Sequence, residues 1–166
     1  MKIIFLDVDG VLRTNSEHMR PTQRLSDRTI WSYNPECIAA LNYVVTATQA
    51  RLVVSSTWRE WGMAKLCSIF ADWGVRQAPY SLTPRSIRDP WSVEHCWGER
   101  GDEIQWWIAL HQERDREPIE QFVIFDDEND VGLLLPCLLQ TVPDIGLTWE
   151  NAQEAIVLLQ TKEIAL

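Results

Sequence analysis

Short apolar runs that end abruptly in polar residues recur along the chain. The run at residues 2–6 (KIIFL) stops at Asp7, the run at 51–54 (RLVV) stops at Ser55, and the run at 121–125 (QFVIF) stops at Asp126. Such runs are typical of buried parallel strands. Two further strands are expected, one at residues 138–142 and a short one near Val75.

Between these runs, apolar residues recur at spacings of three and four, which is the period of a helix. The four stripes are Ile38, Leu41 and Val45; Leu66, Ile69, Phe70 and Trp73; Ile104, Trp107, Ile108 and His111; and Ala152, Ala155, Ile156 and Leu159. We expect the third helix to open at Asp102 and Glu103 and to stop at Pro118, and the fourth to open near Thr148. Strands that alternate with helices predict an α/β fold, a Rossmannoid three-layer sandwich with a mostly parallel sheet.

Two segments break this alternation and carry no clear periodicity. Residues 13–34 follow the first strand, and residues 76–99 are rich in Pro, Arg and Trp. Long irregular loops in a compact domain tend to be functional. We expect one hydrolase domain over residues 1–166 with a minimal cap, in which 13–34 form a flap and 76–99 form a lid-like loop.

Composition narrows the class of protein. The 166 residues are 46% hydrophobic, yet no apolar stretch approaches the roughly 20 residues that span a bilayer. The N-terminus does not fit a signal peptide, and the four cysteines form no C-x-x-C pair, so we expect a soluble, cytoplasmic protein. The net charge of −9 argues against a broad grip on nucleic acid but leaves room for a local basic cleft.

The polar residues that follow the strands predict a metal site. In an open α/β sheet, ligands bind beyond the carboxyl ends of the strands, so Asp7, Asp9, Ser55 and the acidic segment 126–130 are expected to converge. Several carboxylates in one place need a compensating cation. Oxygen ligands without a partnering His or Cys select Mg²⁺.

Three motifs together resemble the haloacid dehalogenase (HAD) superfamily of phosphatases. They are FLDVDGVL at 5–12, VVSST at 53–57 and IFDDEND at 124–130, in the order and spacing of that superfamily. The third motif carries Phe125 where the superfamily has glycine. The resemblance covers nearly the whole chain and implies a phosphoric monoester hydrolase.

The resemblance also implies roles for the acidic residues. Asp7 would be the nucleophile that forms an aspartyl-phosphate, and Asp9 the general acid and base. Mg²⁺ would be held by Asp7, by the backbone carbonyl of Asp9 and by Asp126. The supporting carboxylate would be Asp127 or Asp130, and the sequence does not decide between them.

Other residues match the phosphate-binding positions of the superfamily. Ser55 stands at the hydroxyl of the second motif with Ser56 as its alternate, and Gly10 belongs to the first motif. The superfamily also places a Lys or Arg before the fourth strand, and Arg100 fits because no lysine lies between Lys65 and Lys162. Arg59 either contacts the substrate or faces water.

The resemblance implies a phosphorylated substrate, and two features favour a nucleic-acid 3′-phosphate end. The segments RGDEIQWW (100–107) and GLT (146–148) resemble small HAD domains associated with RNA repair. Basic and aromatic side chains also interleave in the two irregular segments, and they either stack on bases or pin the loops to the core. These residues are Arg13, Arg20, Arg24, Arg28, Trp31, Arg85, Arg88, Trp91 and Trp97.

Two alternatives to this substrate stay open. One is a phosphatase of small metabolites or nucleotides, and the other is a non-catalytic phosphate-binding module with the same fold. A kinase is excluded within this sequence because it has no G-x-x-x-x-G-K-[ST] loop. The sequence does not indicate an oligomeric state.

Overall fold

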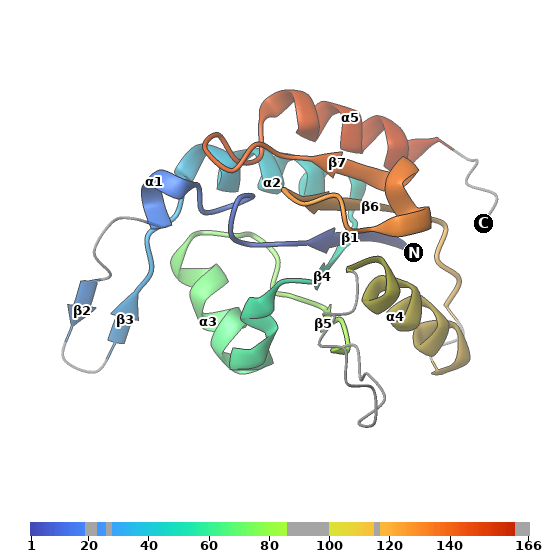
Figure 1. Cartoon of the computed structure of the whole chain (residues 1–166), viewed down its shortest axis with the longest axis horizontal. Helices are drawn as coiled ribbons and strands as arrows, with labels where there is room; N and C mark the ends of the chain where they lie inside the picture. The colour runs from blue at the N-terminus through green and yellow to red at the C-terminus, as the bar shows by residue number, and fades with distance from the viewer. Residues whose placement is uncertain (19–22, 26–27, 86–99, 115–116, 162–166) are drawn as a thin grey trace, which may run out of the picture.

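The computed structural model describes residues 1–18, 23–25, 28–85, 100–114 and 117–161 (Figure 1). Its centre is a five-stranded, entirely parallel sheet in the order β5-β4-β1-β6-β7. The strands are β1 (Lys2–Leu6), β4 (Arg51–Val54), β5 (Ser81–Leu82), β6 (Gln121–Asp126) and β7 (Leu138–Gln140). The predicted α/β fold class is therefore confirmed.

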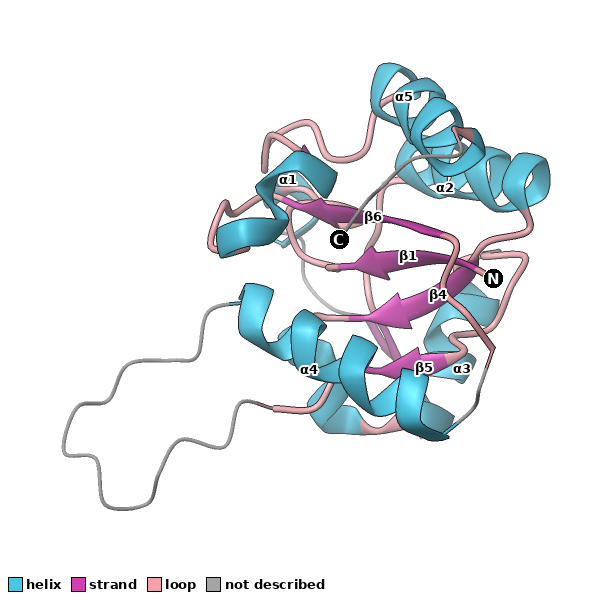
Figure 2. Ribbon diagram, turned by 90° about the vertical axis from the view of Figure 1, so that its right-hand side faces the viewer, coloured by secondary structure: helices cyan, strands magenta, loops and turns pink. Residues whose placement is uncertain are grey.

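Helices cover both faces of the sheet. They are α2 (Pro35–Thr48), α3 (Met63–Asp72), α4 (Arg100–Arg114) and α5 (Trp149–Gln160), with short 3₁₀ turns η1 (Thr57–Trp61) and η2 (Gly132–Cys137). Because side chains alternate along a strand, Ile4 and Leu6 of β1 pack with α2, α3 and α5. Ile3 and Phe5 pack on the other face with α4 and η2. Figure 2 shows α4 and α3 on opposite sides of the strands.

The order of the strands reverses at β1. From β1 the chain moves outward to β4 and β5, then returns to add β6 and β7 on the other side of β1. Leu6 pairs with both Val54 and Phe125, so β1, β4 and β6 end at one level. In sheets of this kind the crevice at the point of reversal binds ligands. The functional site is therefore expected just beyond Leu6.

The strand predicted near Val75 is wrong. Val75 instead follows α3, where its backbone N–H donates to the carbonyl of Phe70 at 2.9 Å and its side chain is buried. The edge strand is β5, inside the segment expected to form a lid-like loop, and it pairs with β4 through Val53 and Ser81. The sequence does not distinguish a buried apolar residue just after a helix from one in a short buried strand, because both kinds of position favour apolar residues.

The segment 13–34 also holds regular structure that its sequence does not indicate. It contains the helical turn α1 (Asn15–His18) and an antiparallel pair, β2 (Gln23–Leu25) and β3 (Arg28–Ile30). Two helix ends differ as well, because α4 begins at Arg100 rather than at Asp102 and ends at Arg114, before Pro118. Within the described ranges, no helix has the length and apolarity needed to cross a membrane.

Candidate active site

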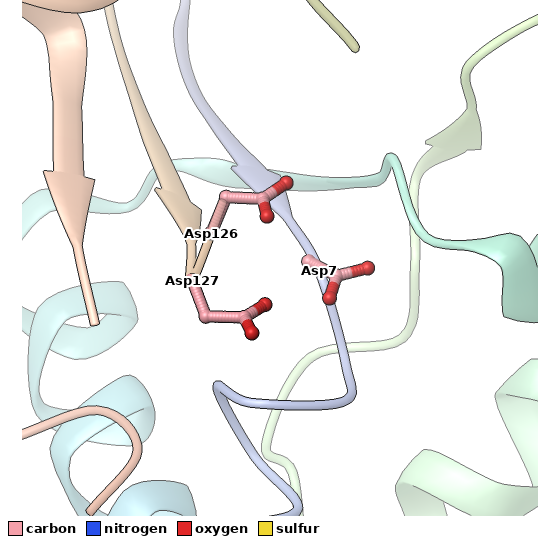
Figure 3. Close-up of side chains that lie close together, drawn as sticks. All are labelled: Asp7, Asp126 and Asp127. Carbon is pink, nitrogen blue, oxygen red and sulfur yellow. The ribbon is translucent and has the colours of Figure 1, made fainter. Parts of the chain in front are cut away.

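Three carboxylates meet beyond the ends of β1 and β6. The backbone N–H of Asp7 donates to the carbonyl of Phe125 at 2.9 Å, which brings Asp7 beside Asp126. Asp7, Asp126 and Asp127 each offer an oxygen within 4.8 Å of the others (Figure 3). Asp7 and Asp126 are buried and Asp127 is partly exposed. A group of hard anionic oxygens with no nitrogen or sulfur ligand fits Mg²⁺.

Burial and mutual repulsion shape the protonation of these carboxylates. Burial, followed by the charge of Asp126, raises the pKa of Asp7 from 3.8 to about 7, although Arg100 and a hydrogen bond from Ser56 act in the opposite direction. Burial likewise raises the pKa of Asp126 to about 6. Burial also raises the pKa of Asp127. A bound cation would restore the ionised forms because it favours negative charge.

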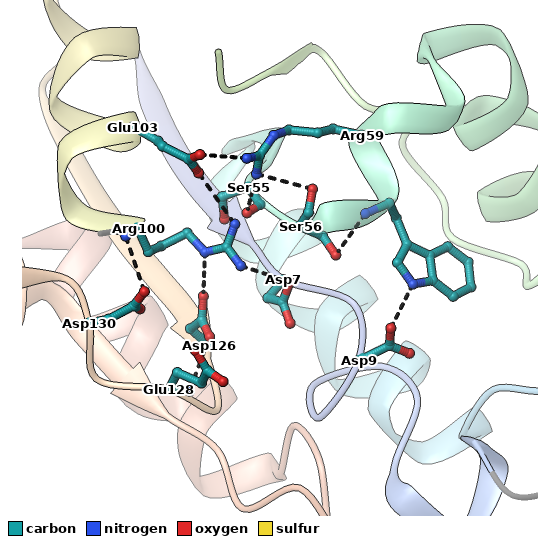
Figure 4. Close-up of polar contacts among 11 residues, drawn as sticks. Asp7, Asp9, Ser55, Ser56, Arg59, Arg100, Glu103, Asp126, Glu128 and Asp130 are labelled. Atoms are coloured by element: carbon teal, nitrogen blue, oxygen red, sulfur yellow. Dashed lines mark hydrogen bonds and ion pairs between the residues drawn. The ribbon is translucent and has the colours of Figure 1, made fainter. Parts of the chain in front are cut away.

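Arg100 lies between the two buried carboxylates. Its Nε is 3.1 Å from Asp126 Oδ2, and its Nη2 is 3.6 Å from Asp7 Oδ1 (Figure 4). Burial alone would lower the pKa of Arg100, but the charges of Asp7 and Asp126 raise it above its ordinary value. The structure thus places a permanent cation beside the residue expected to be the nucleophile.

Glu103 connects Arg100 to a second arginine. Its carboxylate is 3.5 Å from Arg100 Nη1 and 2.5 Å from Arg59 Nη2, and it is buried. Arg59 also donates to the backbone carbonyls of Ser55 and Ser56 at 3.0 and 3.2 Å. Arg59 therefore neither faces water nor points away from the site, and burial lowers its pKa. From the sequence, Glu103 was predicted only as a charge at the start of a helix, although its spacing of three from Arg100 was a usable signal.

The two serines after β4 differ in their surroundings. Ser55 is completely buried, and its Oγ has no hydrogen-bond partner among the described residues. The Ser56 side chain already has hydrogen-bond partners, because its Oγ accepts from the backbone N–H of Trp58 at 3.3 Å and its side chain also hydrogen-bonds Asp7. A buried hydroxyl without a partner is costly unless a ligand completes it. Ser55 thus keeps a hydroxyl that a ligand could complete, whereas Ser56 lies beside Asp7.

The carboxylate of Asp9 lies outside the group of three carboxylates. Its Oδ1 accepts from Arg13 Nη1 at 2.6 Å, and its Oδ2 accepts from Trp58 Nε1 at 2.7 Å. Its side chain is 40% exposed, whereas that of Arg13 is buried. Two donors thus fix the orientation of Asp9. Neither contact was predicted from the sequence, although Arg13 stands four residues after Asp9.

Gly10 and Asp130 support the loops around the site. Gly10 has φ +75°, and a Cβ there would lie 2.3 Å from Asp127 Cγ, so only glycine lets this loop pass the carboxylate. Asp130 Oδ2 accepts from the backbone N–H of Arg100 at 3.2 Å, and its carbonyl accepts from Gly101 N–H at 3.1 Å. Asp130 therefore binds the start of α4 rather than joining the group of three carboxylates.

A protein-family model matches most of the chain. The family described as "HAD domain in Swiss Army Knife RNA repair proteins" matches residues 3–152, a range that includes each residue of the site described above. No curated protein matches the chain.

Proposed function

The chain belongs to the family of HAD domains in Swiss Army Knife RNA repair proteins, and from this membership we propose that it is a magnesium-dependent phosphomonoester hydrolase that works through an aspartyl-phosphate. The family supports a HAD-type, phosphatase-like function in general. The observation that carries the specific proposal is the buried Asp7 carboxylate, which lies 3.6 Å from the Arg100 guanidinium and beside Asp126.

In the first step a carboxylate oxygen of Asp7 attacks phosphorus while the bond to the leaving oxygen breaks. Asp9 donates its proton to that oxygen, so the alcohol leaves neutral. Arg100 offsets the charge of Asp7 and of the phosphoryl group as they approach, and the Ser55 hydroxyl donates to a phosphoryl oxygen. The product is an acyl phosphate on Asp7.

In the second step water hydrolyses the acyl phosphate. Asp9, now a carboxylate, accepts a proton from the water as the water oxygen attacks phosphorus, which regenerates Asp7 and releases inorganic phosphate. The contacts from Arg13 and Trp58 orient the Asp9 carboxylate, the form that accepts this proton. Orientation of this kind lowers the entropic part of the barrier.

We assign the metal to Asp7, Asp126 and Asp127, with the backbone carbonyl of Asp9 as a further ligand. Asp127 is chosen over Asp130 because Asp127 belongs to the group of three carboxylates and Asp130 binds the start of α4. When bound, Mg²⁺ supplies positive charge that screens carboxylate from phosphate and polarises the phosphoryl group.

The variant Asp7→Asn tests the mechanism. We expect it to abolish turnover of phosphomonoesters and to leave the circular-dichroism spectrum unchanged, because the amide is nearly isosteric but is not an anionic nucleophile. The exposed Asp144, which contacts Asn15, gives the control Asp144→Asn, which is expected to keep full activity. A wild-type protein that binds phosphate but turns over no phosphomonoester would instead identify a non-catalytic binding module.

We propose a nucleic-acid 3′-phosphate end as the substrate, rather than a small metabolite. The RNA-repair description of the family and the position of Trp31 near the site support this choice. Four further residues that were predicted to contact such a substrate lie outside the described residues: Arg20, Arg88, Trp91 and Trp97.

This choice predicts a preference for polymers. A 3′-phosphorylated oligonucleotide is expected to have a higher kcat/KM than the matching mononucleotide, and added salt is expected to reduce the advantage. A better kcat/KM for the mononucleotide or for a sugar phosphate at low salt would contradict the choice.

The free cysteines Cys37, Cys67 and Cys137 support a cytoplasmic location, which we also propose.

A further inference from the structure

Three tryptophan rings form a cluster beside Asp9. The ring centroids of Trp58 and Trp61 are 4.6 Å apart, those of Trp31 and Trp61 are 4.8 Å apart, and those of Trp31 and Trp58 are 5.4 Å apart. Trp58 is buried at 5% exposure, whereas Trp61 is 41% exposed. This tryptophan cluster therefore begins in the core and ends at the surface.

The cluster is joined directly to the residue assigned as general acid. Trp58 Nε1 donates to Asp9 Oδ2 at 2.7 Å. Because Asp9 protonates the leaving oxygen in the proposed reaction, the group attached to that oxygen has to lie beside Asp9. It therefore lies next to Trp58 and within reach of the exposed ring of Trp61.

The rings that support Trp61 are held in place. The Arg13 guanidinium carbon lies 5.6 Å from the Trp31 ring centroid and 5.1 Å from that of Trp58, and Arg13 Nε donates to the carbonyl of Ser32 at 2.8 Å. Trp73 Nε1 donates to the carbonyl of Trp31 at 3.1 Å. A pre-formed aromatic surface loses little entropy when a planar ligand stacks on it.

We propose that the tryptophan cluster is the leaving-group subsite and that it takes the planar base of the nucleotide that carries the phosphate. The inference rests on the proposed function and specifies what recognises its substrate. The phosphate would lie inward at Asp7 and Arg100, the sugar would pass Asp9, and the base would stack at Trp61. Stacking on tryptophan accepts any base, which suits an enzyme that acts on ends of differing sequence.

Exposure alone does not distinguish Trp61, because Trp106 and Trp149 are exposed to a similar degree, at 39% and 44%. Trp61 differs in its ring contact with Trp58, which donates to Asp9. Trp149, with a similar exposure of 44%, pairs with Tyr43 between α2 and α5 and has no contact with the site. Trp149 therefore provides a matched control.

The test compares two phosphate esters of secondary alcohols that differ in the leaving group. Adenosine 3′-phosphate carries a base, and glycerol 2-phosphate does not, while both require a similar proton from Asp9. We expect Trp61→Ala to lower kcat/KM for adenosine 3′-phosphate about tenfold, the loss of one stacked base, and to leave kcat/KM for glycerol 2-phosphate unchanged. Trp61→Phe is expected to restore most of the loss, and Trp149→Ala to change neither substrate.

A binding measurement separates this inference from the proposed function. Calorimetric titration of adenosine 3′-phosphate into Asp7→Asn protein and into Asp7→Asn/Trp61→Ala protein is expected to give a Kd about tenfold weaker for the second. A weaker Kd for the double variant, together with no turnover by the wild type, would support the subsite but contradict the proposed phosphatase activity. Normal turnover with equal Kd values, or equal losses for both esters, would show that the cluster only packs the flap and would overturn the subsite.

Discussion

The carboxylate of Glu103 lies between two arginines that perform different tasks. Arg100 contacts Asp7, the proposed nucleophile, while Arg59 donates to the carbonyls of Ser55 and Ser56. A buried carboxylate that bridges two guanidinium groups fixes both by charge-assisted hydrogen bonds. In the proposed reaction, Glu103 would therefore position the two arginines without reaching the reacting atoms itself.

Replacement of Glu103 by glutamine is expected to reduce both stability and catalysis. The loss of charge weakens two contacts, which lowers the free energy of unfolding by about 1.5–3 kcal/mol. Because Arg59 and Arg100 would be held less firmly, kcat is expected to fall about tenfold. Urea denaturation and steady-state kinetics with Mg²⁺ measure the two effects.

Glu60 offers a matched control for Glu103. It forms an ion pair with Arg85 at 3.0 Å, but both side chains are more than half exposed. Exposed pairs contribute at most about 1 kcal/mol, so Glu60→Gln is expected to change stability little and kcat not at all. Equal effects of Glu60→Gln and Glu103→Gln would show that Glu103 does not position the two arginines.

At the level of elements, the start of α4 decides where Arg100 lies. The helix packs so closely on the segment after β6 that a Cβ on Gly101 would lie 2.3 Å from the carbonyl oxygen of Val131. The backbone N–H groups of Arg100 and Gly101 also donate to Asp130. The position of the cation thus depends on helix packing as well as on its own ion pairs.

Gly101→Ala is expected to displace α4 from this segment. The overpacking costs about 1–3 kcal/mol of stability, and kcat is expected to fall because Arg100 moves with the helix. Gly74→Ala is the control, since Gly74 has φ +78° with open space around it, and alanine there costs about 1–2 kcal/mol by backbone strain alone. Thermal denaturation and kinetics are expected to show similar losses of stability but a loss of kcat only for Gly101→Ala. An unchanged kcat in Gly101→Ala would contradict the link.

An apolar run, rather than length alone, decided whether the sequence predicted a strand. Strands β1, β4 and β6 hold four to six residues, and their apolar runs were readable. Strand β7 has only three residues but was predicted at residues 138–142 from its apolar run. Strand β5 has two residues, and its place is set by pairing with β4 rather than by its own pattern. Strands β2 and β3 were missed because their sequences, QRL and RTI, contain no apolar run.

The site shows a similar division between what the sequence predicted and what it did not. Asp7, Ser55, Arg100 and Asp126 were predicted because each stands at a fixed place relative to a strand or helix end. The contact of Trp58 with Asp9 was not, because their separation along the chain carries no sign that an indole and a carboxylate meet. Sequence periodicity reports which face of an element is buried, but not which side chains of distant elements touch.

At the level of the whole molecule, the buried carboxylates couple stability to pH and to Mg²⁺. The folded-state pKa of Asp7 is raised from 3.8 to about 7 and that of Asp126 to about 6. Between about pH 4 and 7 the folded, metal-free protein therefore holds protons that the unfolded chain releases. Without metal, stability is expected to fall as pH rises through this window.

Mg²⁺ is expected to reverse this trend, because it binds the ionised carboxylates and competes with protons. The increase in Tm on addition of Mg²⁺ is expected to be larger at pH 8 than at pH 5, as measured by thermal denaturation at both values with and without the metal. Asp7→Asn removes one of the titrating groups and is expected to reduce the difference. Equal increases in Tm at the two pH values would contradict the assignment of these carboxylates to the metal.

The reversal of strand order at β1 also fixes when the site can form during folding. Lys2 pairs with Gln121, so the central strand gains its second neighbour only after most of the chain has been synthesised. Contacts between residues so far apart along the chain form slowly, because a long loop has to close first. The nascent chain can pair β1 with β4 and bury one side of β1 early, while Asp7 stays solvated and distant from Asp126. The repulsion between these two carboxylates therefore cannot arise before β6 docks beside β1.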